Sequence, residues 1–229
     1  MATLETFRER LLEQYRKVEI RPIDFSYAIR TACFRLWLEP SPLKCFTLKQ
    51  TGEGICICCP VDVDFSCEQV QKLVRAAILR ALKKSAGSYL PPLLEALAER
   101  YGFSYRKVKI TGARSRWGSC SAAGTISLSC YLMLLPPHLM DYVLLHELSH
   151  TKEMNHGPRF WELLDSLTEG KALSLRLNCG TIALHSDDFF RFHLCLNVLY
   201  REIHSFTLPD RLFFSGKIRT LHRQKIRIQ

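Results

Sequence analysis

The spacing of apolar residues along the chain switches between helical and extended periods. Residues 1–20 and 67–85 carry apolar side chains three or four positions apart, which is the spacing of one face of an amphipathic helix. Residues 93–101 predict a further helix, which Gly102 ends. Between the first two helices, residues 27–64 are rich in β-branched, aromatic and cysteine residues and are punctuated by Pro and Gly. This segment predicts two to four antiparallel strands.

The second half of the chain returns to strands and then to helices. Residues 105–110 and 125–132 alternate in the manner of strands and predict a strand pair. Two consecutive prolines follow at a place where a helix can begin, and residues 139–152 continue without a breaker. The run NHGP at 155–158 ends this helix and begins another, with Gly170 near its end. The whole pattern predicts an α+β fold with N-terminal antiparallel strands and a helical core.

The segment HELSH lies in the predicted helix 139–152 and carries two histidines four positions apart. On an α-helix, His146 and His150 lie about 40° apart around the axis and about 6 Å apart along it, so both imidazoles can reach one metal ion. Glu147 is turned about 100° from His146, which leaves its carboxylate beside the metal, where it can accept a proton from water. The order of these residues suits hydrolysis, with zinc as the expected metal.

A catalytic zinc ion usually has three protein ligands, so a third ligand is expected. His156 is the first candidate, because the NHGP run ends the helix and lets the chain fold back toward the other histidines. A carboxylate from the next helix, Glu162 or Asp165, is the alternative.

A chance match to HExxH on a surface helix is the competing interpretation. The helix, however, is apolar nearly all round, so its histidines are expected to be partly buried and to need polar partners. A metal supplies a partner for both histidines, and the metal interpretation is therefore favoured.

The residues around HELSH resemble those of a known family. The YgjP-like metallopeptidases, zincins related to the SprT-like proteins, are closely similar to the run RSRWGSCSAAGTISLSCYLMLLPPHLMDYVLLHELSHTKEMNHGPRFWELL. The hallmarks of that family are an RWGSC segment, a strand and then YVxxHELxHxxxxNHxxxFW, and they match this chain at 116–120, 126–129, 142–156 and 160–161. The resemblance covers roughly residues 20–167 and implies a zincin-like fold and zinc-dependent cleavage of peptide bonds.

The resemblance also implies roles for individual residues. His146, His150 and His156 correspond to zinc ligands, and Glu147 corresponds to the catalytic residue. The chain departs from the family at Ser129, where the family often has Asn. We expect zinc to acidify a bound water and polarise a peptide carbonyl, while Glu147 accepts the proton and delivers it to the leaving amine.

The loop before the strand at 126–129 has two interpretations. As a functional element, Arg116 and Trp117 border the substrate cleft, and an adjacent strand pairs with an extended peptide. As a structural element, Trp117 fills the core and Gly118 makes a turn. The sequence favours neither interpretation.

Ten cysteines are scattered along the chain without the spacing of a disulfide framework, so we interpret them as reduced thiols of a cytoplasmic protein. The CxxC spacing at residues 56–59 can mark a metal or redox site, but the surrounding GICICCPV is more typical of a buried strand. The N-terminus lacks the apolar run of a secretory signal, and Pro136 and Pro137 break the most apolar later stretch. No membrane partner is expected.

The chain has a formal net charge of +10, and residues 201–229 hold seven Lys or Arg against two acidic residues. Basic residues mixed with phenylalanines are typical of single-strand nucleic-acid binders, but no recognisable nucleic-acid motif accompanies them. We therefore expect residues 1–177 to form the metallopeptidase domain and residues 178–229 a basic, aromatic C-terminal extension. The expected partner is a peptide or protein substrate. The alternatives are a non-catalytic, zinc-containing nucleic-acid-binding module and a peptidase that acts on nucleic-acid-bound proteins.

Overall fold

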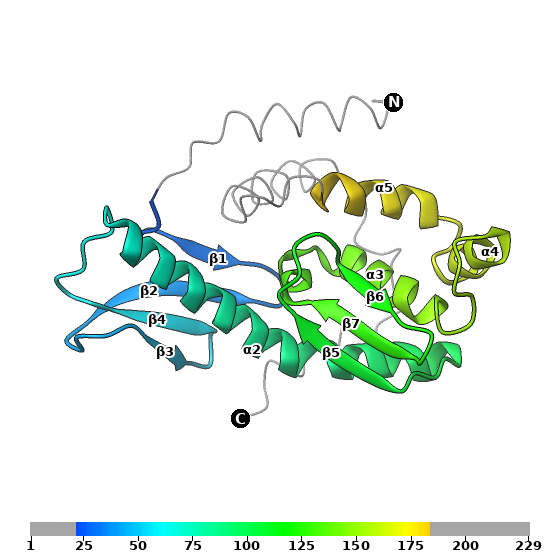
Figure 1. Cartoon of the computed structure of the whole chain (residues 1–229), viewed down its shortest axis with the longest axis horizontal. Coiled ribbons are helices and arrows are strands. Elements are labelled where there is room, and N and C mark those ends of the chain that lie inside the picture. Colours follow the sequence, from blue (N-terminus) through cyan, green and yellow to red (C-terminus); the bar gives the residue numbers. More distant parts are fainter. Residues whose placement is uncertain (1–21, 184–229) are drawn as a thin grey trace.

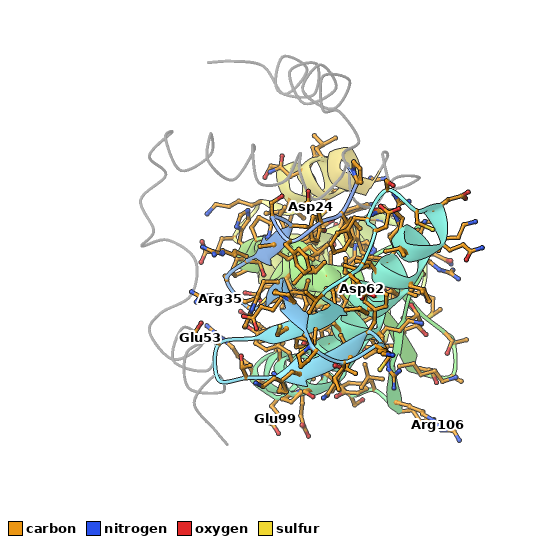
Figure 2. The ribbon with its side chains drawn as sticks, turned by 90° about the vertical axis from the view of Figure 1, so that its left-hand side faces the viewer. Asp24, Arg35, Glu53, Asp62, Glu99 and Arg106 are labelled. Carbon is orange, nitrogen blue, oxygen red and sulfur yellow. The ribbon has the colours of Figure 1, made fainter. Side chains whose placement is uncertain are left out.

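The computed structural model describes residues 22–183, which form two β-sheets and a set of helices (Figure 1). This arrangement confirms the predicted α+β fold. The helix predicted at residues 1–20 and most of the C-terminal extension lie outside the described residues. Figure 2 views the N-terminal sheet from its end and shows charged side chains such as Glu53, Glu99 and Arg106 at the periphery, around a crowded interior.

The N-terminal sheet has four strands, within the predicted range of two to four, in the order β1-β2-β4-β3. The prediction that all pairs are antiparallel is wrong for one pair, because β2 and β4 run parallel. In that pair Leu38 lies opposite Ile57, and both are buried, so the parallel pairing joins the two most apolar strands in the middle of the sheet. The strands are β1 (Ala28–Arg30), β2 (Arg35–Ser41), β3 (Thr47–Gln50) and β4 (Ile55–Pro60).

A single long helix, α2 (Glu68–Tyr101), replaces the two helices that the sequence predicted in this region. Pro91 and Pro92 separate the two predicted segments, and each lacks the N–H of one helical hydrogen bond. The helix nevertheless continues, because Leu90 and the leucines after the prolines stay buried in the core, and this packing outweighs the lost hydrogen bonds. Gly102 ends the helix with a left-handed φ of 66°, as predicted.

The second sheet has three strands in the order β5-β7-β6. β5 and β7 confirm the predicted strand pair and run parallel to each other. β6 falls in a segment that the sequence predicts as a loop, because the strand is short and rich in small residues. It pairs antiparallel with β7, with Gly118 opposite Leu128, and forms one edge of the sheet. The strands are β5 (Lys107–Thr111), β6 (Gly118–Cys120) and β7 (Thr125–Ser129).

Three helices follow the second sheet and a short 3-10 helix. α3 begins at Pro137 as predicted and is buried on nearly all sides, but it ends at Ser149 rather than at residue 152. α5 was not predicted, and the domain boundary proposed after residue 177 falls within it. Within residues 22–183 no helix is both long and apolar enough to cross a membrane. These elements are η1 (Cys130–Leu134), α3 (Pro137–Ser149), α4 (Pro158–Leu167) and α5 (Ala172–Ala183).

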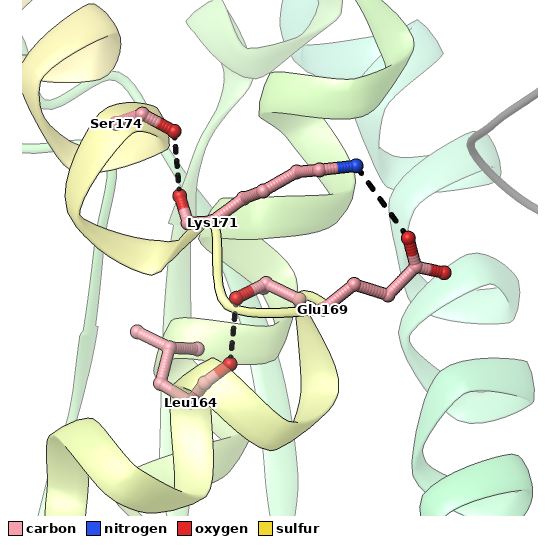
Figure 3. Close-up of polar contacts among 5 residues, drawn as sticks. Leu164, Glu169, Lys171 and Ser174 are labelled. Carbon is pink, nitrogen blue, oxygen red and sulfur yellow. Dashed lines mark hydrogen bonds and ion pairs between the residues drawn. The ribbon is translucent and has the colours of Figure 1, made fainter.

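A tight turn connects α4 to α5 (Figure 3). The hydroxyl of Thr168 donates to the carbonyl of Leu164 at 2.8 Å, and the hydroxyl of Ser174 donates to the carbonyl of Lys171 at 2.9 Å. Lys171 Nζ and Glu169 Oε2 form an ion pair at 3.5 Å. The turn brings α5 back against α3, the helix that carries HELSH.

Candidate metal centre

Three histidine side chains converge at the C-terminal end of α3. His146 lies in the last turn of the helix, His150 caps it, and His156 lies in the loop before α4. Nε2 of His146 is 3.3 Å from Nε2 of His150 and 3.1 Å from Nε2 of His156. The candidate ligand atoms of the three residues all lie within 4.8 Å of one another. Zinc–nitrogen bonds of about 2.05 Å place two nitrogens of a tetrahedral site about 3.3 Å apart, so the spacing fits zinc.

The chain reverses direction between His150 and His156. The backbone N–H of Glu153 donates to the carbonyl of Ser149 at 2.9 Å, which adds one hydrogen-bonded turn after the end of the helix. Gly157 then has an extended conformation, with φ −78° and ψ −179°, and α4 starts at the next residue. This reversal brings His156 back beside His146 and His150. If α3 continued as a helix, His156 would lie about 15 Å beyond His146 along the axis.

Neighbouring groups hold the imidazoles in place. Nδ1 of His150 lies 3.1 Å from the carbonyl oxygen of Glu153. That oxygen can only accept, so the proton sits on Nδ1 and the Nε2 lone pair is free for a metal. The buried ring of Phe160 contacts all three imidazoles, with ring centroids 4.9 Å from His146, 4.6 Å from His150 and 4.7 Å from His156. Phe160 thus forms an apolar floor under the three rings.

His156, the most exposed of the three histidines, is anchored by an aromatic stack. Nε1 of Trp161 donates to the carbonyl of His156 at 3.1 Å, and the two rings stack at 5.8 Å with an interplanar angle of 27°. The guanidinium of Arg176, from α5, lies 4.9 Å from the Trp161 ring centroid. The stack therefore fixes the candidate ligand that lies outside a helix.

The electrostatics of the site favour neutral imidazoles. Burial lowers the pKa of His146 to about 3, and the neighbouring His150, His156 and Arg176 act in the same direction. Burial, followed by His150 and Arg176, also lowers the pKa of His156. Nε2 of His146 carries at most one proton and cannot donate to both neighbouring Nε2 atoms, whereas a cation between the rings satisfies all three lone pairs. The donor set therefore fits a divalent transition metal.

Glu147 brings a carboxyl group to the same place. Its side chain is buried, with 5% of its surface exposed, and lies against the backbone of Gly118 in β6. Burial raises the pKa of Glu147 to about 8, while the charge of Arg116 acts in the opposite direction. Oε2 of Glu147 has no hydrogen-bond partner within the described part of the chain. The carboxyl group thus lies against β6, and one of its oxygens has no partner among the described residues.

Comparison with known proteins shows the family to which this chain belongs. The family model described as YgjP-like, metallopeptidase domain, matches residues 5–174. The chain belongs to the YgjP-like metallopeptidase family. Among solved structures, a metallopeptidase zymogen, abylysin of Pyrococcus abyssi, is 27% identical over 39% of this chain and 90% of its own, with a TM-score of 0.36. No curated protein matches the chain.

The RWGSC segment of this YgjP-like protein forms β6 and the two residues that precede it, Arg116 and Trp117. Nε1 of Trp117 donates to the carbonyl of Cys179 on α5 at 3.3 Å, and the ring packs against the core. Trp117 therefore fits the structural interpretation better than the cleft interpretation. Arg116 is exposed and influences the pKa of Glu147, so its charge lies near the site.

The acidic alternatives for the third metal ligand do not join the histidines. Glu162 is exposed, and Oδ1 of Asp165 accepts from the backbone N–H of Ala172 at 3.0 Å, at the start of α5. Within residues 22–183 only the three histidines form a group that could hold a metal ion. Sequence reasoning missed that Phe160 forms the floor under the three imidazoles. It also missed that the guanidinium of Arg176 lies over the ring of Trp161. Phe160 carried a signal in the FW pair of the family motif, whereas Arg176 lies beyond the matched residues and carried none.

Proposed function

We propose that this YgjP-like metallopeptidase is a zinc peptidase in which His146, His150 and His156 hold the metal and Glu147 is the general base. The supporting observation is the convergence of three imidazole nitrogens beside a buried carboxyl group. Catalytic zinc has three protein ligands and one open position, whereas structural zinc has four protein ligands. When bound, zinc supplies Lewis acidity, which acidifies water and polarises a peptide carbonyl.

Glu147 moves the proton in this proposal. Its Oε2, which has no hydrogen-bond partner within the described residues, takes a proton from water. A pKa raised by burial makes this carboxylate a stronger base than an exposed one, and the positive charge of Arg116 favours its ionised form. The protonated carboxyl group then gives the proton to the leaving amine.

Peptide and protein substrates fit the edge of the second sheet. β6 pairs with β7 on one side, contacts α3, and has no strand on its other side among the described residues. An extended peptide that adds to this edge runs past Gly118, and hence past the carboxyl group of Glu147. We assign Arg116 to substrate binding at this edge and Trp117 to support of the strand.

The compartment and the second candidate function follow from composition. Nine cysteines of the described residues are free thiols, which supports the cytoplasm as the working compartment. The net charge of +10 favours polyanions and makes a peptidase acting on nucleic-acid-bound proteins the second candidate. Binding to single-stranded DNA that weakens with salt would support that candidate, and binding without any peptidase activity would support a non-catalytic module.

Zinc analysis and peptide cleavage by matched variants test the proposal. We expect about one zinc ion per chain in the wild type and in Glu147→Gln, because the amide leaves the ligands untouched. Hydrolysis of a peptide library by Glu147→Gln should fall by about 10²- to 10⁴-fold, the usual effect of losing a general base. Glu162→Gln, an exposed acid on α4, is the control and should keep both properties. Full activity in Glu147→Gln would refute the assignment.

A further inference from the structure

Gly118, the first residue of β6, lies in direct contact with the side chain of Glu147. A Cβ atom added to Gly118 would lie 2.6 Å from both Cγ and Oε1 of Glu147 and 2.7 Å from its Cδ. Real Cβ atoms do not approach other heavy atoms this closely, so one group would have to move. The contact involves the stem as well as the tip of the glutamate, so a small rotation of the carboxyl group cannot relieve it.

The glycine at this position is required for space and not for backbone conformation. The glycines with a positive φ are elsewhere in the described residues, at Gly54, Gly102, Gly124 and Gly170. Gly118 has ordinary strand geometry, which any residue can adopt. An alanine here therefore changes the contact with Glu147 and leaves the preferred backbone conformation intact.

Neither partner has an easy way to withdraw. β6 is held by its antiparallel pairing with β7, and the backbone N–H of Ser129 donates to the carbonyl of Trp117 at 2.8 Å, next to Gly118. Glu147 lies on α3, which is buried on nearly all sides, and its own side chain is almost wholly buried. An added methyl group would therefore turn the glutamate into another rotamer.

We propose that Gly118 is a positioning residue, whose missing side chain lets the carboxyl group of Glu147 lie flat against the edge strand β6. This inference rests on the proposed role of Glu147. Oε2 of Glu147 has no hydrogen-bond partner in the described chain, so steric contact with β6 sets the position of the carboxyl group. The glycine of the RWGSC segment thereby links the edge strand to the general base.

A double-mutant cycle of thermal stability tests the contact without any assay of activity. Gly118→Ala should lower the Tm of the metal-free protein by about 4 to 8 °C, as expected for overpacking in a chain of this size. In the Glu147→Ala background the same change should have little effect, because the atoms that it strikes are gone. Gly112→Ala is the control. Its Cβ would meet Lys83 Cε at 2.9 Å, the far end of a flexible side chain that can move away.

Kinetics of the zinc-loaded protein test the consequence. Gly118→Ala should bind zinc as the wild type does and lower kcat by about 100-fold, the typical effect of misplacing a catalytic group by about 1 Å. Its KM should change by less than about twofold, because the substrate edge remains. Gly112→Ala should keep the wild-type kcat.

The outcomes separate the contact from the catalytic role. Equal Tm losses for Gly118→Ala in both backgrounds, or failure of both the single variant and the double variant to fold, overturn the contact. Recovery of folding only in the double variant supports it. A wild type without peptidase activity refutes the proposed function, and the stability cycle still decides whether Gly118 positions Glu147. A wild-type kcat in Gly118→Ala overturns the inference even where the Tm values couple.

Discussion

Two regions of the molecule place three candidate metal ligands close together in sequence, and only one of the two brings all three together in space. β4 carries Cys56, Cys58 and Cys59, and α3 with its following loop carries the three histidines. Successive side chains of a strand point to opposite faces, so the thiols of Cys56 and Cys59 diverge. Residues four apart on a helix share a face. A sequence spacing of ligands therefore predicts a metal site only when the helix or strand that carries the ligands is also considered.

Burial acts on both regions and has opposite consequences for metal binding. It raises the pKa of Cys56 to about 12 and that of Cys59 to about 11, which keeps these thiols protonated. It lowers the pKa of His146 to about 3, which keeps this imidazole neutral. Burial favours the neutral form in each case. A neutral imidazole binds metal and a neutral thiol does not. Burial therefore favours metal binding by the histidines and disfavours metal binding by the cysteines.

The largest expected effect separates the two sets of ligands. His156→Ala should lose stoichiometric zinc and with it peptide hydrolysis, because only the two imidazoles at the end of α3 remain of the three proposed ligands. Cys56→Ala in β4 should retain the zinc content and the activity of the wild type. Zinc per chain after dialysis and peptide cleavage measure both outcomes. Wild-type zinc content in His156→Ala would show that another residue is the third ligand.

A smaller effect is expected from a change of Trp161 beside the histidines, compared with a change of Trp37 in the N-terminal sheet. Trp161→Leu removes the hydrogen bond and the stack that hold His156, and should weaken zinc binding about 10- to 100-fold, as is typical of groups behind a metal ligand. Trp37→Leu is the matched control, since the indole of Trp37 also donates a hydrogen bond, to Glu39 at 2.6 Å, but in the N-terminal sheet. Competition with a zinc chelator measures both affinities. Equal affinities in the two variants would show that the stack does not support the metal.

The smallest expected effect is a pH dependence of stability in the metal-free protein. Burial raises the pKa of Glu147 from an ordinary 4.5 to about 8, so the folded state holds a proton that the unfolded state releases, and stability falls as pH rises through this interval. Asp141 acts in the same direction up to about pH 7, whereas His146 acts in the opposite direction and only below 6.5. The interval from pH 7 to 8 therefore isolates Glu147 among these three groups.

The measurement is the Tm of the metal-free protein at pH 7 and pH 8. The wild type should lose up to about 1.4 kcal/mol over this interval, or up to about 3 to 6 °C. Glu147→Gln should show a smaller loss, because the amide does not titrate. Identical slopes in the two proteins would mean that the carboxyl group of Glu147 is already ionised in the fold.

The sequence predicted the convergence of the three histidines more completely than it predicted the sheets, for a physical reason. The pairing of His146 with His150 follows from helical geometry, and the return of His156 follows from the helix-ending run around it, so both depend on local residues. The parallel pairing of β2 with β4 depends on which strands become neighbours in the sheet, and the residues near each strand in sequence do not determine that choice. The same holds for α2, where burial of Leu90 and its neighbours overrides the two prolines.

Contacts between distant segments were also beyond local reasoning. Trp117 is 62 positions from its acceptor Cys179, and Arg176 reaches Trp161 from a helix that the hydrophobic pattern did not predict. The approach of Gly118 to Glu147 joins a segment read as a loop to the helix of the site. Each of these contacts requires the fold to be known, because nothing in the neighbouring residues specifies the partner.

Because α2 is long, it packs against both the N-terminal sheet and the part of the protein that holds the histidines. A helix of 34 residues extends for about 50 Å, so it forms a beam that both sheets share. It buries Val74 and Ile78 near its start and Leu94 and Leu97 near its end, and it contacts β3 and β4 of the first sheet, β5 of the second sheet, and η1. A shortened protein that lacks the N-terminal sheet would expose to water the apolar side chains of α2 that pack against that sheet. Truncated variants should therefore keep α2 whole, and we expect truncation within α2 to yield insoluble fragments.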